Sequence, residues 1–315
     1  MYFCVTQITP IRNIKMKINT IKFVAVSLLF VVAIACNNVG KSTYTKDNQV
    51  KFDTLMVDKK YHLLNDTSNP WCELNVEFVY PIKSSKQDDL TRLQQLFVRG
   101  TFGRLYEELS VEDALDKYVA NFIKNYEADA RIFHEDLLDL ENHPTLIPQT
   151  FDEDHENELP SNEFYTYNES LINRIHFNES NILSFQVFQS NNKGGAATYS
   201  SYNNFVINLK TGSLLTENDI FAPGYDVALQ QLFANSLMLE NDVKSISELE
   251  DLGYFGIQEI MPNRNFLIDD KGITYTFNKG EYSAYPLNAP MVFLSFNDLR
   301  MVLKPNTVVS KLAGL

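Results

Sequence analysis

Cys36 is the residue whose surroundings most clearly indicate a chemical modification. It follows Ala33-Ile34-Ala35, and before it lie a basic stretch and the thirteen apolar or small residues 23–35. That length suits the core of a signal peptide and is short for a membrane span. Small residues directly before a cysteine fit a lipobox, where signal peptidase II cuts and the cysteine is lipidated. We expect residues 1–35 to be a lipoprotein signal peptide, with an ordinary signal peptide or an uncleaved anchor as the alternatives.

Lipidation at Cys36 would attach the chain to a membrane outside the cytoplasm. An acyl chain contributes about 0.8 kcal/mol per buried CH2, and stable anchoring needs more than one chain. Residues 36–50 are polar and predict a flexible tether. We expect a cell-envelope location, at the outer membrane of a Gram-negative cell, with the leaflet left open. Translation from Met16 would also give a compact basic-then-apolar signal.

Catalytic patterns are missing from the sequence. It contains no HExxH, no GxSxG and no CxxC pair, and its five histidines have no metal-ligand spacing. The acidic run 152–156 suits a hard cation such as calcium or, without the glycine of a calcium loop, a solvated charge run. We therefore predict no catalytic residue, metal or cofactor. The alternative is an envelope glycan hydrolase that uses an unrecognised carboxylate pair. Cys72 is expected to be a small buried hydrophobic residue.

Tyrosines and a glycine pair are the candidates for binding. The chain has sixteen tyrosines, several near predicted loops, and amphipathic aromatic side chains favour interfaces. An equally acceptable interpretation is that these rings cover the sheets. The candidate ligand-binding residues are Gly194, Gly195, Tyr199, Tyr202, Tyr282 and Tyr285.

The charge of the chain restricts its partners. The formal net charge is −13, and the segment before Cys36 holds four basic residues and no acid, so its removal leaves −17. Such a surface repels nucleic acid and anionic lipid and attracts basic partners. The simpler interpretation is that acidity keeps an exported protein soluble.

The first half of the soluble part predicts strands on either side of helices. Residues 74–80 alternate as a strand that ends at Pro81, and residues 90–97 have helical spacing before a break at Gly100 and Gly103. Ser110 and Asp113 form a capping box that opens a helix through Tyr126.

Residues further along predict a long loop and then more strands. The acidic stretch 134–159 contains Pro144 and Pro148 and has little periodicity, which indicates a loop. The strands expected after it are 164–168, 172–177, 182–188 and 205–209, with a turn at 178–181.

The second half predicts helices followed by a hairpin. Asn218 and Asp219 are expected to cap a short helical turn. The further expected elements are helices over 229–237 and 245–252, a hairpin over 266–277, and a helix over 299–303 capped by Asn297-Asp298.

Several stretches resemble a family of bacterial extracytoplasmic modules, of the type found in the lysozyme-sensing anti-sigma factor RsiV and in the non-catalytic N-terminal region of the deacetylase PdaC. The matching stretches are Gly194-Gly195-Ala196, the Asn208–Gly212 turn followed by Asp219-Ile-Phe221, Asn265-Phe266, 270–277, 281–285 and 292–296. The family pattern GGAH has alanine at Ala197 here, so no role of that histidine transfers.

The fold predicted from these patterns is α+β, with two packed units that each have a mainly antiparallel sheet and helices on one face. The resemblance implies a PdaC-like unit at 51–205 and an RsiV-like unit at 206–315. It also implies a binding protein that recognises lysozyme or a peptidoglycan or glycan fragment; a structural envelope protein is the third possibility.

Overall fold

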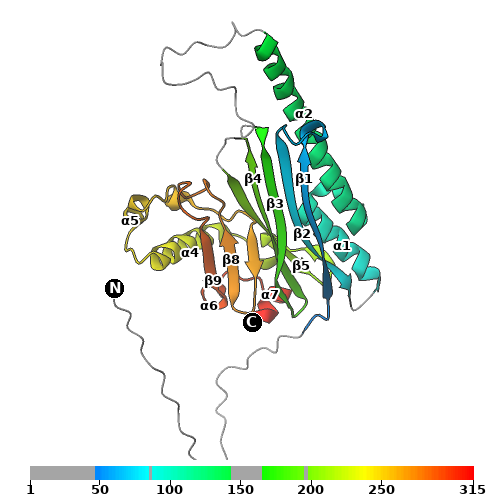
Figure 1. Cartoon of the computed structure of the whole chain (residues 1–315). Coiled ribbons are helices and arrows are strands. Elements are labelled where there is room, and N and C mark those ends of the chain that lie inside the picture. Colours follow the sequence, from blue (N-terminus) through cyan, green and yellow to red (C-terminus); the bar gives the residue numbers. More distant parts are fainter. Residues whose placement is uncertain (1–46, 85–86, 143–164, 195–197) are drawn as a thin grey trace, which may run out of the picture. The chain divides into compact units, whose positions relative to one another are not determined.

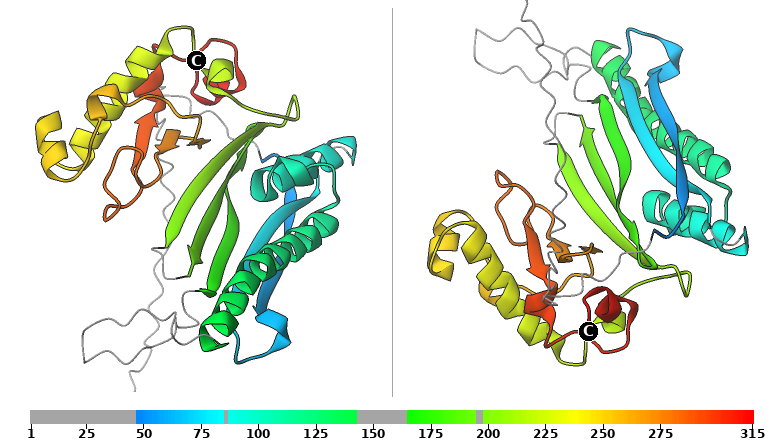
Figure 2. Two further views of the ribbon diagram at one scale, coloured as in Figure 1. Left: turned by 90° about the horizontal axis from the view of Figure 1, so that it is seen from above. Right: turned by 90° about the horizontal axis from the view of Figure 1, so that it is seen from below.

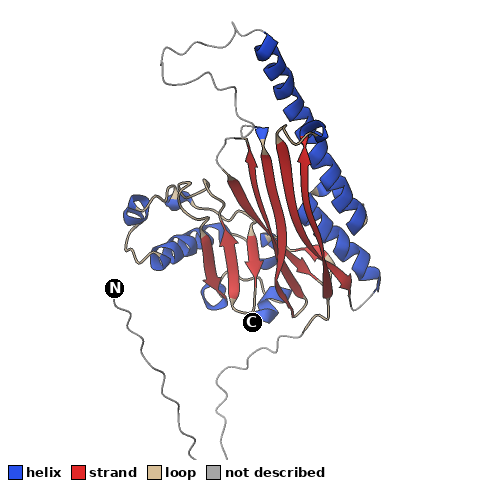
Figure 3. Cartoon of the chain, in the orientation of Figure 1, coloured by secondary structure: helices blue, strands red, loops and turns tan. Residues whose placement is uncertain are grey.

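Two β-sheets with flanking helices make up the protein. The computed structural model describes residues 47–84, 87–142, 165–194 and 198–315. These residues belong to one compact unit, Ser42–Leu315. It contains a six-stranded sheet, β1 to β6, and a three-stranded sheet, β7 to β9 (Figure 1). Helices lie alongside both sheets (Figure 3), which confirms the predicted α+β class.

The large sheet keeps its strands in sequence order. Its neighbours are antiparallel except β2 and β3, which are parallel. A parallel pair needs a long crossover, and α1 and α2 provide it. The strands are β1 Lys51–His62, β2 Trp71–Lys83, β3 Tyr167–Glu179, β4 Ile182–Lys193, β5 Tyr199–Asn208 and β6 Ser213–Leu214, and the crossover helices are α1 Gln87–Phe102 and α2 Val111–Asn142, with single 3-10 turns at Leu63–Asn65 and Arg104–Tyr106.

The first core lies between the large sheet and the two crossover helices. The rings of Phe97 on α1 and Phe185 on β4 stack with centroids 4.2 Å apart. Gly100 lies inside α1, so the predicted break there is wrong. A Cβ on Gly100 would approach the Phe185 ring to 2.8 Å, so glycine permits this close packing. The helix ends at Phe102, before Gly103, whose φ of 97° favours glycine.

Helix α2 begins as the capping box predicts. The Ser110 hydroxyl accepts a hydrogen bond from the Asp113 backbone N–H at 3.1 Å and donates to its carboxylate at 2.7 Å. The helix then continues to Asn142, so the loop predicted from His134 is wrong for residues 134–142. Leucine and glutamate favour helix there, and the helix ends two residues before Pro144. Residues 143–164, including the acidic run 152–156, lie outside the described residues.

Strands β2 to β5 are all longer than their patterns suggested. Strand β2 passes Pro81, which pairs with Phe52 where the register of β1 and β2 shifts, so the predicted end at Pro81 is wrong. Strand β3 joins two strands that were expected to be separate. Its irregularity between Ile175 and Phe177 breaks the simple alternation. The predicted turn at 178–181 is confirmed, with positive φ at its last two residues.

Residues 217–315, here called the C-terminal lobe, contain the small sheet and the remaining helices. Thr216 and Ser295 cap α3 and α6, so the caps predicted at Asn218-Asp219 and Asn297-Asp298 are each displaced toward the N-terminus. The elements are α3 Glu217–Ile220, α4 Tyr225–Glu240, α5 Ile246–Asp251, a 3-10 turn Ile257–Glu259, β7 Phe266–Ile268, β8 Gly272–Thr276, β9 Met291–Ser295, α6 Phe296–Leu299 and α7 Val308–Leu312.

Strands β4 and β5 contribute side chains to two cores. Successive residues of a strand point to opposite faces. Leu183 and Ile207 therefore join the first core, whereas Ile182 and Val206 join a second core with the small sheet and α4. Figure 2 shows the small sheet between β3–β5 and α4. The boundary expected between residues 205 and 206 lies within β5.

Asparagine side chains form hydrogen bonds with the backbone along the outer edge of β5, the edge that faces away from β4. The backbone N–H of Tyr202 donates to Asn278 Oδ1 at 2.7 Å, and that of Asn204 donates to Asn265 Oδ1 at 2.8 Å. The Tyr202 carbonyl accepts from the side-chain amides of Asn265 at 2.9 Å and Asn278 at 3.1 Å. Asn265 also donates to the carbonyl of Thr276 on β8 at 2.9 Å. Two side chains thus replace a neighbouring strand and attach the C-terminal lobe to the large sheet.

Replacing Asn265 with alanine is expected to destabilise the protein by about 2–4 kcal/mol. The change leaves the buried N–H of Asn204 without its acceptor, and an unpaired buried polar group costs roughly 1–3 kcal/mol. Urea unfolding measures the loss. Asn203→Ala, at an exposed neighbouring position, is the matched control and should change stability by less than ~0.5 kcal/mol. Equal effects of the two variants would contradict the role of the asparagine.

Candidate functional site

Two tyrosines predicted to bind a ligand, Tyr199 and Tyr202, lie on β5 and point to opposite faces of the large sheet. Tyr202 shares its face with Val206, which belongs to the second core. Tyr199 shares its face with Ile207 of the first core and is 46% exposed. These two candidates therefore cannot contribute to a single binding surface.

The tyrosines predicted in the C-terminal lobe have different surroundings. Tyr282 packs edge-on against Phe277, with ring centroids 5.2 Å apart, and its hydroxyl accepts a hydrogen bond from the Met261 N–H at 3.4 Å. It therefore supports the second core. Tyr285 is 66% exposed, and its ring lies against Gly280.

Of the two glycines predicted to bind a ligand, the structure describes only Gly194. Gly194 has a φ of 51° and donates a backbone hydrogen bond to the Thr166 carbonyl at 3.0 Å, at the end of β4. Gly195 and Cys36 lie outside the described residues. Of the predicted binding residues that are described, only Tyr202 lines the cleft between the large sheet and the C-terminal lobe.

A cleft of about 720 Å³ opens between the large sheet and the C-terminal lobe. Its volume is within the usual range for ligand sites, which often lie where two parts of a fold meet. Strands β4 and β5 form one wall, and the end of α4 and the segment before β9 form the other. The lining residues are Phe188, Ser200, Tyr202, Leu237, Glu240, Tyr254, Lys279, Leu287, Asn288, Ala289, Pro290 and Met291.

Aromatic and polar groups alternate on the sheet wall of this cleft. Phe188 and Tyr202 pair across β4 and β5, with ring centroids 5.0 Å apart and a 43° tilt. Ser200 lies beside them, and Lys279 and Glu240 come from the other wall. Rings can pack against the apolar side of a ligand while hydroxyl and charged groups bond to its polar atoms. The arrangement suits an amphipathic, hydroxyl-rich ligand.

A polar hollow of about 330 Å³ adjoins the cleft on the same sheet face. Ser190, in its lining, is the cross-strand partner of Ser200 in the cleft. Glu73, Asn75 and Asn168 extend this surface over β2 and β3. Amides, hydroxyls and a carboxylate therefore continue from the cleft across the open face of the sheet.

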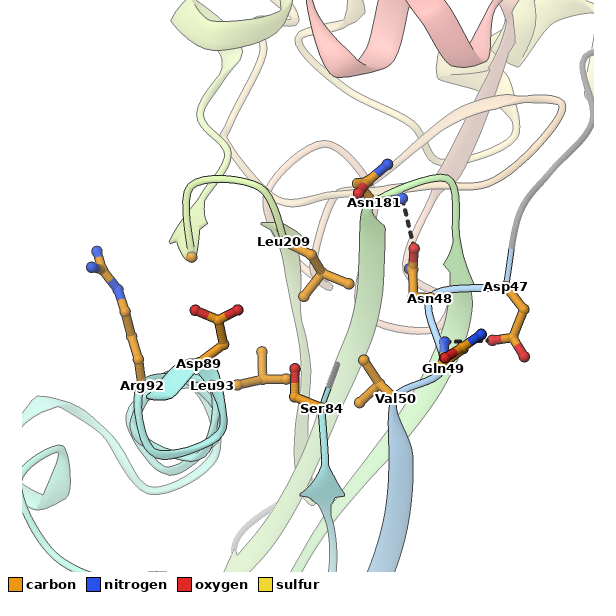
Figure 4. A pocket seen from close by; sticks show the side chains of 11 residues that line it. Asp47, Asn48, Gln49, Val50, Ser84, Asp89, Arg92, Leu93, Asn181 and Leu209 are labelled. Carbon is orange, nitrogen blue, oxygen red and sulfur yellow. Dashed lines mark hydrogen bonds between the residues drawn. The ribbon is translucent and has the colours of Figure 1, made fainter. Parts of the chain in front are cut away.

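A third pocket, of about 280 Å³, lies where residues 47–50 meet the β3–β4 turn and α1 (Figure 4). Asn48 donates to the Ile182 carbonyl at 2.8 Å and accepts from the Asn181 N–H at 2.6 Å. Asp89 and Arg92 of α1 also line it. Because Asn48 uses its amide to attach residues 47–50 to the β3–β4 turn, this pocket marks the junction with the chain that leads to Cys36.

The described ranges also bear on metal binding and on membrane spanning. No three His, Cys, Asp or Glu side chains gather there as metal ligands would. Of the helices in those ranges, none combines the length and the apolar character needed to cross a bilayer.

Phe188 and Lys279 are cleft residues that the sequence did not single out. Phe188 was visible as the last residue of a predicted strand, and alternation places it on the face of Ile182. What the sequence lacked was any signal that the segment 279–291 folds back over that face.

Part of the C-terminal lobe matches a known protein family. Residues 218–297 match DUF3298, described as a protein family of unknown function. A DUF3298 family member from Bacteroides fragilis has 24% identity and a TM-score of 0.74, over 86% of this chain and 100% of its own. Another from Pseudomonas aeruginosa has 12% identity and a TM-score of 0.52, over 82% and 97%. No functionally curated protein matches. The structural neighbours show the fold.

Cys72 is expected to be unreactive in the folded protein. It is buried, which raises the pKa of its thiol to about 12, and the nearby charge of Glu127 adds to this effect. Since the thiolate is the reactive form, alkylation at pH 8 should be at least ~100-fold slower than in urea. A chain with Cys4→Ser and Cys36→Ser isolates this thiol. Because unfolding releases a thiol of lower pKa, stability should fall as the pH rises above ~9. Fast alkylation without denaturant would contradict this.

Proposed function

We propose that this protein is a lipid-anchored cell-envelope binding protein that holds its ligand in the cleft between β5 and the C-terminal lobe. The observation that carries the proposal is the 720 Å³ cleft with the paired rings of Phe188 and Tyr202 beside hydroxyl, amide and charged groups. The favoured ligand is a peptidoglycan or other glycan fragment, whose ring CH groups pack on aromatic faces and whose hydroxyls bond to polar side chains.

The position of the tether supports this arrangement. Residue 47 is eleven positions after Cys36, so the intervening chain spans on the order of 40 Å at most. It joins the sheet at the β3–β4 turn, beside Asn181. Phe188 lies seven residues further along β4, roughly 23 Å away. The cleft would therefore remain accessible on an anchored molecule.

We also propose that the chain is related to the RsiV/PdaC-type modules. Asn265 and Phe266, part of the resembling sequence, lie where the C-terminal lobe attaches to β5. The DUF3298 match covers the same region. A basic protein such as lysozyme is the second candidate ligand, which the charge of −17 after removal of the signal segment favours. A protein partner would need about 800 Å² of surface, more than the cleft alone.

Titration calorimetry with muramidase-released peptidoglycan fragments tests the ligand. We expect binding to the wild-type chain and roughly five- to tenfold weaker binding to Tyr202→Ala, because one aromatic wall is lost. Tyr199→Ala, on the opposite face of the same strand, should bind as the wild type does. A parallel titration with lysozyme at low and moderate salt tests the second candidate. Absence of heat with both ligands, or equal losses in both variants, would overturn the assignment.

Lipid attachment at Cys36 is tested by labelling cells with a palmitate analogue. The wild-type chain should incorporate label and sediment with membranes. Cys36→Ala should lose the label, whereas Cys72→Ala should keep it, because Cys72 is buried in the folded protein. Label on the Cys36→Ala chain would contradict the proposal.

A further inference from the structure

A fourth cavity, of about 150 Å³, lies between α2 and the ends of β3 and β4. It is on the face of the large sheet that α1 and α2 cover, opposite the cleft. Half of its lining residues are aromatic. The lining residues are Tyr106, Tyr118, Asn121, Phe122, Asn125, Tyr126, Asp129, Tyr167, Glu169 and Lys193.

Two carboxylates in this wall are held by phenols. The Tyr118 hydroxyl donates to Glu169, and the Tyr167 hydroxyl donates to Asp129 at 3.3 Å. Burial and then the charge of Glu169 raise the pKa of Tyr118, so its phenol remains a neutral donor. These hydrogen bonds fix the carboxylates without neutralising them. Within the described part of the chain, neither carboxylate forms an ion pair with a basic side chain.

Among the described residues, one basic side chain lines this cavity, and it lies over an aromatic ring. Lys193 places Nζ 5.6 Å from the centroid of the Tyr167 ring. A cation at this distance over a ring face is attracted by the ring quadrupole. Lys193 is exposed and is the last residue of β4, next to Gly194. The chain thus places a cation of its own at the wall of an aromatic, carboxylate-bearing cavity.

The charge of the wall restricts the ligand further. Tyr126, also in the lining, is 1% exposed and its hydroxyl is enclosed, so this hydroxyl is not available to a ligand. An anion would meet two carboxylates here, and a neutral apolar ligand would leave both carboxylates without a counter-ion.

We propose that this cavity binds an organic cation, an alkylammonium or guanidinium group, and that Lys193 is its internal competitor. The aromatic walls attract the cation, Asp129 and Glu169 balance its charge, and its N–H groups find acceptors. The group can come from a free amine or from a lysine or arginine side chain of a polypeptide. The site is independent of the cleft, so either assignment can fail without the other.

Titration of the full-length protein with n-butylammonium and ethylguanidinium, followed by ligand-observed NMR, tests the site. The cations should bind at least tenfold more tightly than n-butanol, the matched neutral ligand. An acetylated, amidated tripeptide with one central lysine distinguishes the sources. Tighter binding of the peptide indicates a polypeptide partner, and equal binding indicates a free amine. Absence of binding by all the cations, or equal binding of butanol, would overturn the proposal.

Variants of the lining residues test whether Lys193 competes with the ligand or has only a structural role. Lys193→Met should bind butylammonium three- to tenfold more tightly, whereas Lys210→Met, in the turn at the other end of β5, should leave affinity unchanged. Glu169→Gln should weaken binding about tenfold. Asp129→Asn, at an exposed position, provides the same test if the Glu169 variant does not fold. Unchanged or weaker binding by Lys193→Met would contradict the role of Lys193 as a competitor.

Discussion

The outer edge of β5 imposes the constraint on which the C-terminal lobe depends. Among the described residues, no strand beyond the two-residue β6 pairs with this edge, yet its backbone groups are partly buried and need partners. Asn265 and Asn278 supply them from the C-terminal lobe. Because an amide side chain both donates and accepts, two asparagines can satisfy a strand edge without adding a strand. The same bonds hold the segment that closes the cleft.

This attachment gives the two faces of the large sheet different roles. One face is covered by α1 and α2 over an aromatic core, with Phe97, Phe185 and Phe205 in successive ring contacts. The other is covered by the small sheet over β4, β5 and the end of β3 at Phe177, and the rest of its β2–β3 part carries amides, hydroxyls and charges. The proposed ligand cleft forms at the boundary between covered and open surface, where rings and polar groups are adjacent. The proposed cation cavity lies under α2, where tyrosines meet carboxylates.

The sequence predicted correctly those features that depend on neighbouring residues. The capping box at Ser110 and the turn at 178–181 involve neighbouring residues, and both form as expected. The continuation of α2 past His134 was missed because two prolines and many acids resemble a loop. The passage of β2 through Pro81 was missed because the register shift beside it, at which Ile82 is skipped, shows only when β2 is paired with β1.

The candidate site was harder to predict because it depends on contacts distant in sequence. Strand alternation alone already separates Tyr199 from Tyr202, and applying it would have divided the predicted aromatic face. Nothing local indicated that Asn265 would bond to a strand sixty residues earlier, that Tyr282 would pack in the core, or that Phe188 would line a cleft. These features arise when the C-terminal lobe folds onto β5.

Amide hydrogen exchange at Tyr202 and Asn204, resolved by NMR in the unliganded protein, tests the central claim directly. Both amides point away from β4 toward Asn278 and Asn265, at an edge that no strand of the described residues covers. If asparagine side chains pair them and hold the lobe in place, both should exchange as slowly as the amides of β4 in the core. Exchange at the rate of an open strand edge would contradict this account of how the lobe, and with it the cleft, is built.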